Sequence, residues 1–339
     1  MAPLASLTAL FVLILVVYCE AVRAYTLVHD YNYKNWYSSF IFENLPDPTK
    51  GFVDYQSLHD SLALGLTRII GKQVYMTVDN TSIIPLTSTG RKSIWLESKD
   101  TFKHGLLIGD FEHMPGSDCG IWPSFWAFHN YNNPGVYGEI NILEGSSDIT
   151  RNYISLHTSN NCTFKSPADK QTGVPNENNF DCNLSNGAGC SVHAPEGTYG
   201  SSFNKQGGGV YALHWTSRFI KVYFFSRNSI PADIVAGKPN PVKWPLPNAN
   251  FDNRYGKCDV DKSFQEMTVF FDSTFCGAAA GGRAWTEWTD CSVKTGVNTC
   301  EEYVANNPHA YDDAYWLINY VRIYQRSEDI VKAASDGES

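Results

Sequence analysis

Two glutamates in one short β-rich segment have the spacing of a catalytic pair. The segment covers residues 137–145 and contains Glu139, Asn141 and Glu144. Side chains alternate across a strand, so Glu139 and Asn141 share a face, whereas strict alternation puts Glu144 on the opposite face. A β-bulge at Ile142-Leu143 would return Glu144 to the first face, roughly 6–7 Å along the chain from Glu139.

Two carboxylates at that spacing can converge to the ~5–5.5 Å of a retaining glycosidase pair. The alternative is a sandwich strand with solvated glutamates, and the spacing alone favours this alternative. Trp122 and Trp126 lie just upstream and change that balance, because aromatic faces stack on sugar rings. Taken singly, each of these tryptophans is more typical of a protein core than of a ligand platform.

The elements that must position these residues are short β-rich runs bounded by Gly, Asn, Pro or Ser. Residues 219–224 alternate with a period of two, as a strand does. Residues 58–66 alone suggest a helix, and Gly65 weakens it. The pattern therefore predicts an all-β sandwich, with residues 159–209 as a long excursion over its surface. The other strand-like runs are residues 74–78, 106–111, 137–143, 153–156, 267–271 and 315–324.

Composition narrows the class of ligand. The chain has 339 residues, 35 acidic against 26 basic side chains and a formal net charge of -9. This balance argues against a nucleic-acid partner, which would require clustered Lys and Arg. Hydrophobic residues make up 43% and aromatic residues 14%, enough for a large core and too many for a disordered chain. Neutral, ring-shaped ligands such as sugars fit this composition.

The N-terminus has the pattern of a secretory signal peptide. An apolar run of about a dozen residues precedes the small-residue end at Ala24, and it is shorter than the roughly 20 residues of a membrane span. We therefore expect a signal peptide at residues 1–24, one catalytic domain at residues 25–325 and a polar tail at residues 326–339. The expected location is extracellular, with no membrane contact. Three glycosylation sequons, at Asn80, Asn161 and Asn183, agree with secretion.

Cysteine usage also indicates an oxidising compartment. Removal of Cys19 with the signal peptide leaves an even number of cysteines, which predicts up to four disulfides. No Cys-x-x-Cys pair is present, so a zinc site is improbable. The connectivity does not follow from spacing, although Cys182 with Cys190 and Cys291 with Cys300 are close enough for local bridges.

Together these motifs resemble a known family of enzymes. The pair Glu139-x-x-x-x-Glu144 follows the run Gly120-Ile121-Trp122-Pro123-Ser124-Phe125-Trp126 and precedes Leu156-His157-Thr158. This order resembles glycoside hydrolase family 16 and, more closely, the secreted fungal laminarinases, which are endo-1,3(4)-β-glucanases. The resemblance extends from about residue 25 to residue 324. It implies a β-jelly-roll sandwich of the concanavalin A-like type, with a cleft across its concave sheet.

The resemblance also implies roles for individual residues. Glu139 matches the nucleophile and Glu144 the general acid/base, while His157 matches a residue that supports the acid/base. Without the resemblance, His157 would be interpreted as a buried, hydrogen-bonded core imidazole. Trp122, Trp126 and Arg91 match positions that line the glucan cleft.

Two positions depart from the family pattern. Asn141 stands where the family has Asp, and its amide is expected to support Glu139 with a hydrogen bond. With one potential negative charge removed, we expect Glu144 to lose its proton at a lower pH than in a relative with Asp. Ala278-Ala279 replaces the Asp-Trp of close relatives, so one stacking platform is expected to be missing.

The favoured function is therefore retaining endohydrolysis of β-1,3 or mixed β-1,3/1,4-glucan by a monomer. This mechanism requires no cofactor, and no set of metal ligands is recognisable in the sequence. A glucan-binding, lectin-like protein with weak catalysis is one alternative on the same sandwich. A transglycosylase, which passes the same intermediate to a sugar acceptor, is the other.

Overall fold

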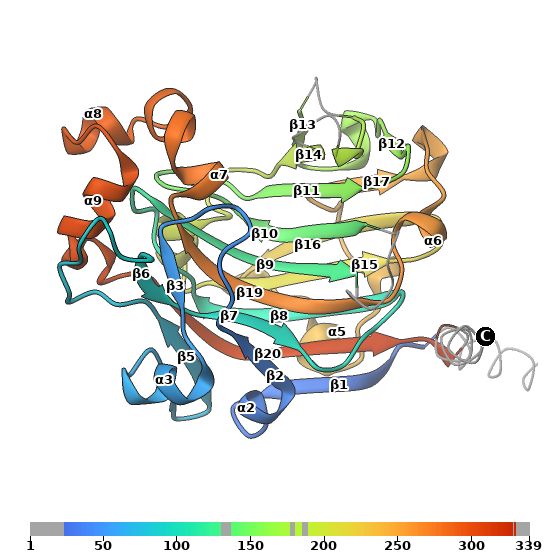
Figure 1. Ribbon diagram of the computed structural model, residues 1–339. Helices are drawn as coiled ribbons and strands as arrows, with labels where there is room; N and C mark the ends of the chain where they lie inside the picture. Colours follow the sequence, from blue (N-terminus) through green and yellow to red (C-terminus); the bar gives the residue numbers. More distant parts are fainter. Residues whose placement is uncertain (1–23, 130–136, 177–179, 185–188, 328, 330–339) are drawn as a thin grey trace, which may run out of the picture.

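The computed structural model describes residues 24–129, 137–176, 180–184, 189–327 and 329. The predicted signal peptide therefore lies outside the described residues except for Ala24, as does most of the predicted tail. The described chain forms two large antiparallel sheets that are layered face to face (Figure 1). The prediction of an all-β sandwich is confirmed.

One sheet, called the cleft sheet below, carries the segment with the two glutamates. Its central strands are longer than its edge strands, and β10 lies between β11 and β9. In spatial order its strands are β13 (Val174–Pro175), β14 (Cys190–His193), β11 (Tyr153–Thr158), β10 (Gly138–Glu144), β9 (Ile121–His129), β19 (Met267–Phe275), β7 (Trp95–Ser98) and β2 (Phe40–Glu43).

The second sheet, called the outer sheet, covers the back of the cleft sheet. In spatial order its strands are β17 (Ala249–Asp252), β16 (Phe219–Ser226), β15 (Gly209–Trp215), β8 (Gly105–His113), β20 (Tyr315–Gln325), β5 (Gln73–Thr77) and β4 (Thr67–Ile70), with β1 (Thr26–Asn32) beside β20. Two small sheets pair β12 (Thr163–Phe164) with β18 (Gly256–Lys257), and β3 (Val53–Tyr55) with β6 (Arg91–Ser93).

Short helices connect the strands, and three of them gather with a π-helix at one end of the sandwich (left in Figure 1). Those at this end are α7 (Gly277–Ala280), α8 (Cys291–Thr295), α9 (Cys300–Asn306) and the π-helix Ala284–Trp288. The others are α2 (Trp36–Ser39), α3 (Leu58–Ala63), α4 (Gly200–Asn204), α5 (Ala232–Val235) and α6 (Val260–Ser263). Five 3-10 turns complete the described chain, at Ala168–Lys170, Arg227–Ser229, Pro241–Lys243, Asn253–Tyr255 and Pro308–Tyr311. Among the described helices, none combines the length and hydropathy that crossing a bilayer would need.

The predicted helix at residues 58–66 corresponds to α3, where Ser57 caps the first turn by accepting a hydrogen bond from the Asp60 backbone. The helices α7 to α9 were not predicted, because they are only four to seven residues long. Helices this short lack a full amphipathic repeat, so periodicity does not reveal them.

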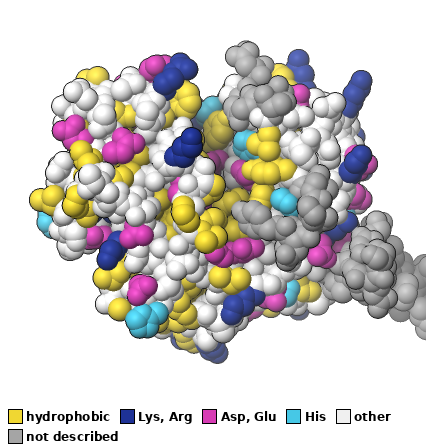
Figure 2. Space-filling model, in the orientation of Figure 1, with side chains coloured by type: hydrophobic (Ala, Val, Ile, Leu, Met, Phe, Trp, Pro, Cys, Tyr) yellow, Lys and Arg dark blue, Asp and Glu magenta, His cyan; other side chains and the backbone are white. Residues whose placement is uncertain are grey.

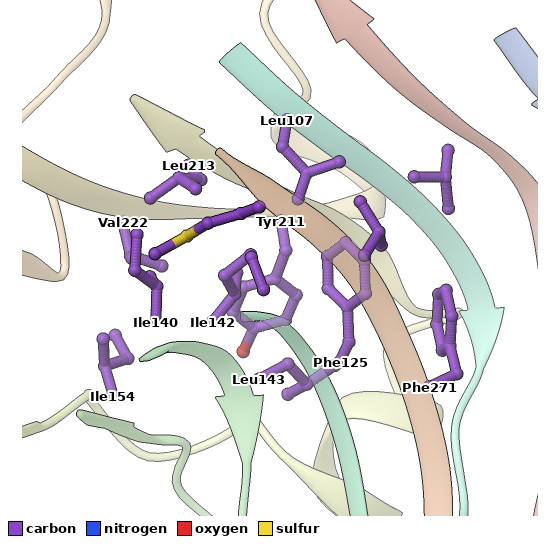
Figure 3. Packing of buried hydrophobic residues seen from close by; sticks show 14 of the residues in the cluster. Leu107, Phe125, Ile140, Ile142, Leu143, Ile154, Tyr211, Leu213, Val222 and Phe271 are labelled. Carbon is purple, nitrogen blue, oxygen red and sulfur yellow. The ribbon is translucent and has the colours of Figure 1, made fainter. Parts of the chain in front are cut away.

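The main core fills the space between the two sheets (Figure 3). Strand β10 contributes Ile140, Ile142 and Leu143, and all three side chains are fully buried. They pack with aromatic and aliphatic residues of both sheets, among them Phe125, Phe271, Leu107, Tyr211, Leu213 and Val222. Burial of each such aliphatic side chain contributes about 1.5–3 kcal/mol, so the core face of β10 strongly fixes the strand in its place.

All eight cysteines of the expected mature chain are paired in disulfides. The bridges are Cys119–Cys291, Cys162–Cys258, Cys182–Cys190 and Cys276–Cys300. The local bridge Cys182–Cys190 is confirmed, whereas the suggested bridge Cys291–Cys300 is wrong. Cys119 and Cys276 adjoin the paired strands β9 and β19, so the fold brings them close to α8 and α9 despite their distance in sequence.

Of the three sequons, Asn161 adjoins the disulfide-bonded Cys162, and its side-chain oxygen accepts a hydrogen bond from Asn183 at 3.4 Å. Asn80 donates to Asp312 at 2.9 Å. Glycosylation at these three positions stays a prediction.

Candidate active site

The bulge expected in β10 is present and brings both glutamates to one face. Pairing with β9 is regular up to Asn141, then shifts between Asn141 and Leu143, so that Glu144 lies opposite Ser124. Ile142 and Leu143 therefore both face the core, and the side chain of Glu144 returns to the face of Glu139. Because of the extra residue, the carboxyl groups of Glu139 and Glu144 face the same cleft.

The side chain of Asn152 satisfies the backbone groups that the bulge leaves without ladder partners. Its Nδ2 donates to the carbonyl of Ile142 at 2.7 Å, and its Oδ1 accepts from the amide of Glu144 at 2.8 Å. An amide side chain can do both at once because it carries a donor and an acceptor. Asn152 is fully buried, and its own amide donates to Thr198. This residue therefore holds the backbone on both sides of Leu143.

Glu139 lies among hydrogen-bond donors. Its Oε1 accepts from Asn141 Nδ2 at 2.8 Å, and its Oε2 accepts from the Tyr137 hydroxyl. His157 Nε2 lies 3.9 Å from Oε1. A carboxylate is an acceptor only, so these surroundings complement the ionised form that a nucleophile requires.

Glu144 has apolar and acidic surroundings. Burial raises its pKa to about 8, and the charges of Glu139 and Asp272 act in the same direction. Hydrogen bonds from Trp122 Nε1 at 3.1 Å and Ser155 Oγ at 3.4 Å oppose the shift. Burial is the larger effect, so Glu144 keeps its proton at neutral pH, as a general acid must.

A third acidic side chain, Asp272 on β19, faces the same side of the sheet. Burial raises its pKa to about 7, and the charges of Asp47 and Glu139 add to the shift. Its Oδ2 accepts a hydrogen bond from Trp126 Nε1 at 2.7 Å. In the ladder, Asp272 pairs with Ser124, which in turn pairs with Glu144, so the two acids are two strands apart.

The side chains of Glu139 and Glu144 open into a cleft of about 1160 Å³. Figure 2 shows the molecule hollowed on this face, between the helical end and the strands beside it. Strands β9, β10 and β11 form its floor, and α7, the π-helix and the segment after β10 form its walls. The lining residues are Trp122, Glu139, Asn141, Glu144, Gly145, Ser146, Ile149, Thr150, Arg151, Tyr153, Ser155, His157, Asn176, His193, Ala278, Ala279, Trp288 and Thr289.

The residues predicted to bind substrate have three different locations. Trp122 lines the cleft, and its Nε1 also donates a hydrogen bond to Glu144. Trp126 is half-buried beside the cleft, with its ring stacked on Phe270 at 4.5 Å between ring centroids. The placement of Arg91 in the cleft is wrong. Its side chain is fully buried and donates to the backbone carbonyls of Asp79, Ser82 and Val304. The guanidinium group therefore links the segments that carry these carbonyls.

The supporting residues Asn141 and His157 both line the cleft. Asn141 donates to Glu139, and its Nδ2 also donates to Ser155 Oγ at 2.9 Å. His157 lies beside Glu139, whereas it was expected to support Glu144. It reaches Glu144 through Ser155, whose Oγ is 3.3 Å from His157 Nε2 and 3.4 Å from Glu144 Oε2.

A family comparison agrees with this geometry. The model of the XgeA-like catalytic GH16 domain matches residues 40–324. The chain belongs to glycoside hydrolase family 16. The family resemblance of the sequence is thereby confirmed.

Curated fungal proteins are similar to this chain over most of its length. A probable glycosidase of Schizosaccharomyces pombe is 40% identical over 306 residues, which are 89% of this chain and 70% of that protein. An endo-1,3(4)-β-glucanase of Arthroderma benhamiae is 36% identical over 306 residues, or 89% of this chain and 65% of that protein. A probable endo-1,3(4)-β-glucanase of Aspergillus niger is 37% identical, and the match spans only 40% of its length.

Solved structures of family 16 enzymes share the fold over 89% of this chain. An elongating family 16 β-1,3-glucosyltransferase is 41% identical with a TM-score of 0.81, covering 89% of this chain and 100% of that chain. Laminarinase 16A of Phanerochaete chrysosporium, with 6-O-glucosyl-laminaritriose in its donor and acceptor sites, is 35% identical with a TM-score of 0.80 and the same coverage.

Several residues around the family 16 glutamate pair were missed from the sequence. Tyr137 and Ser155 could have been found by strand alternation, because they share a face with Glu139 and His157, respectively. Asn152, Asp272 and Trp288 carry no such signal, since their roles depend on contacts between distant segments. Among the described residues, no cluster of three or more His, Cys, Asp or Glu side chains is arranged to hold a metal ion.

Proposed function

We propose that this family 16 protein is an endo-acting β-glucanase that hydrolyses β-1,3 or mixed β-1,3/1,4-glucan with retention of configuration. One observation carries the proposal. Two carboxyl groups face one cleft from the same strand. Glu139 accepts hydrogen bonds from Tyr137 and Asn141, whereas Glu144 is half-buried and has a pKa raised to about 8. Such a difference assigns the roles of nucleophile and general acid in a carboxyl pair.

In the first step, the carboxylate of Glu139 attacks the anomeric carbon of the glucosyl unit beside it. The bond from that carbon to the leaving glucan oxygen breaks, and Glu144 transfers its proton to this oxygen. Asn141 and Tyr137 orient the attacking carboxylate through their hydrogen bonds. The products are a shortened glucan and a glucosyl ester on Glu139.

In the second step, Glu144 is a carboxylate and accepts a proton from an incoming water. The water oxygen bonds to the anomeric carbon, and the ester bond to Glu139 breaks. Two displacements at one carbon restore the original configuration. Glu144 regains its proton and Glu139 its negative charge, so the site is ready for another cycle.

Similar proteins support glucan as the substrate class. The Arthroderma benhamiae relative is an endo-1,3(4)-β-glucanase, and laminarinase 16A binds β-glucans in its donor and acceptor sites. The cleft of this chain contains both aromatic and polar side chains, which suits neutral sugar rings. The mechanism uses only protein side chains.

Transfer of the glucosyl unit to another sugar is a second candidate function. It is favoured by the 41% identity to the elongating β-1,3-glucosyltransferase. In that reaction a sugar hydroxyl takes the place of water in the second step. A purely lectin-like role is less well supported, because both acidic groups of the retaining mechanism are present in the cleft.

Secretion as a monomer completes the proposal. Four disulfides suit an oxidising compartment, and residues 1–24 have the pattern of a signal peptide.

The test is incubation of the pure protein with laminarin and with mixed-linkage glucan, following reducing ends and product lengths. Endohydrolysis predicts a steady rise in reducing ends with intermediate oligosaccharides as early products. Transfer predicts products longer than the starting oligosaccharide with little net rise in reducing ends. Binding without either change would contradict an enzymatic function.

A further inference from the structure

Trp288 is the exposed tryptophan of this protein. Its side chain is 65% exposed, whereas the other eight tryptophans, all within the described chain, are buried or half-buried. An exposed indole can stack on a ring-shaped ligand where it borders a cleft. Trp288 lines the same cleft as Glu139 and Glu144.

The backbone that carries Trp288 is firmly fixed. One turn earlier, Trp285 is fully buried and donates from Nε1 to the carbonyl of Val297 at 3.0 Å. Three residues later, Cys291 is bridged to Cys119, which lies just before β9. Lys294 pairs with Asp148 in the segment that follows Glu144. The indole is therefore presented to the cleft at a defined place.

The surroundings of Trp288 suit a neutral, hydroxyl-rich ring. Ala278 and Ala279 line this part of the cleft with methyl groups alone, so no bulky side chain at these positions fills the space. Thr289 adds a hydroxyl group to the lining. Arg151, the one lysine or arginine among the described lining residues, pairs with Glu196, so its charge is already compensated.

We propose that Trp288 is a stacking platform for a glucosyl unit of a bound β-glucan, forming a subsite at the helical end of the cleft. The inference rests on the proposed function, because a glucan that spans the glutamate pair must continue along the same cleft. Only chains long enough to reach Trp288 from the cleavage point would gain from it.

The experiment measures kcat/KM on laminari-oligosaccharides of increasing length for wild type, Trp288→Ala and Trp288→Phe. Loss of one aromatic stacking contact predicts a decrease of roughly 3- to 10-fold in kcat/KM for Trp288→Ala, confined to the longer substrates. Trp288→Phe should retain most of the wild-type value, because a ring remains. Val293→Ala is the matched control, since Val293 is 83% exposed on the adjoining α8 and does not line the cleft.

Three results would overturn the inference. One is a Trp288→Ala profile that equals wild type at every length, and another is an equal loss at every length together with a lower melting temperature. The third is an unchanged length profile with a change in sedimentation, which would make Trp288 part of a protein interface.

A binding measurement separates this inference from the proposed function. Calorimetric titration of the same oligosaccharides into Glu139→Gln, with and without Trp288→Ala, requires no turnover. If wild type hydrolyses none of them but binding still weakens only for long chains when Trp288 is removed, the subsite stands and the hydrolase proposal fails. If wild type hydrolyses the oligosaccharides normally and removal of Trp288 leaves binding unchanged at every length, the hydrolase proposal stands and the subsite inference fails.

Discussion

Glu139 and Glu144 extend from the same face of β10, yet the two ends of that strand differ in their surroundings. Glu139 is placed by simple alternation and receives hydrogen bonds from Asn141 and Tyr137. Glu144 is placed by a bulge, and burial raises its pKa to about 8. One strand thus provides a carboxyl group that is contacted by hydrogen-bond donors and a second one whose pKa is raised. In the proposed mechanism, local packing, more than residue type, divides the two roles.

Removal of the carboxylate at the Glu139 end should have the largest effect. Glu139→Gln retains the shape of the side chain but cannot form the glucosyl ester, so laminarin hydrolysis should decrease by at least roughly 10³-fold. Oligosaccharide binding and the melting temperature should change little. Reducing-end assays and calorimetry measure the two properties. A variant with near wild-type turnover would show that the nucleophile lies elsewhere.

The effect of replacing Glu144 should depend on the leaving group of the substrate. Glu144→Gln cannot donate a proton, so laminarin hydrolysis should decrease by roughly 10²–10⁴-fold. An aryl β-glucoside with an acidic phenol needs little protonation, so formation of its glucosyl ester should be far less impaired. Burst kinetics with this substrate separate the first step from the second. If the rate of the first step decreased equally for laminarin and for the aryl β-glucoside, the role of Glu144 as the acid would be contradicted.

Asn152 offers a way to disturb one glutamate and leave the other in place. Asn152→Ala leaves the Ile142 carbonyl and the Glu144 amide without their partners, which should cost roughly 2–4 kcal/mol of stability. Because the bulge positions Glu144, turnover of laminarin should suffer more than formation of the glucosyl ester from the aryl substrate.

The matched control for Asn152 is Asn248, which also accepts from a backbone amide, that of Phe224 at 2.6 Å, but on the outer sheet. Asn248→Ala should lose stability with little change in kcat below its melting temperature. If both variants lose activity alike, Asn152 has no particular connection to Glu144.

The sequence predicted much of this site and missed specific parts for physical reasons. Alternation and the bulge follow from local pattern, so the shared face of Glu139 and Glu144 was predictable. Arg91 was misplaced because burial of a charged side chain depends on loops that the sequence pattern does not position. Burial is the largest cause of the raised pKa of Glu144, and it depends on packing between distant segments that the neighbours of Asn141 in the sequence do not reveal.

Two substitutions near Glu144 should shift the pH dependence of activity by smaller amounts and in opposite directions. Asn141→Asp adds a potential negative charge beside the pair, which should raise the pKa of Glu144 and move the upper arm of the activity profile to higher pH. Asp272→Asn removes a charge that raises this pKa, so the upper arm should move to lower pH. Each shift should be below about one pH unit for charges near a solvated cleft. Upper arms that stay fixed in both folded variants would contradict electrostatic control of Glu144.

Identification of the residue that carries the covalent intermediate tests most directly which of the two glutamates is the nucleophile. A 2-deoxy-2-fluoro-laminaribioside with a good leaving group should form a slowly hydrolysed ester, because the fluorine slows both displacements. Peptide mass mapping should locate the added mass on Glu139 in wild type, and Glu139→Gln should remain unlabelled. An adduct on Glu144 or Asp272 would contradict the assignment of Glu139 as the nucleophile.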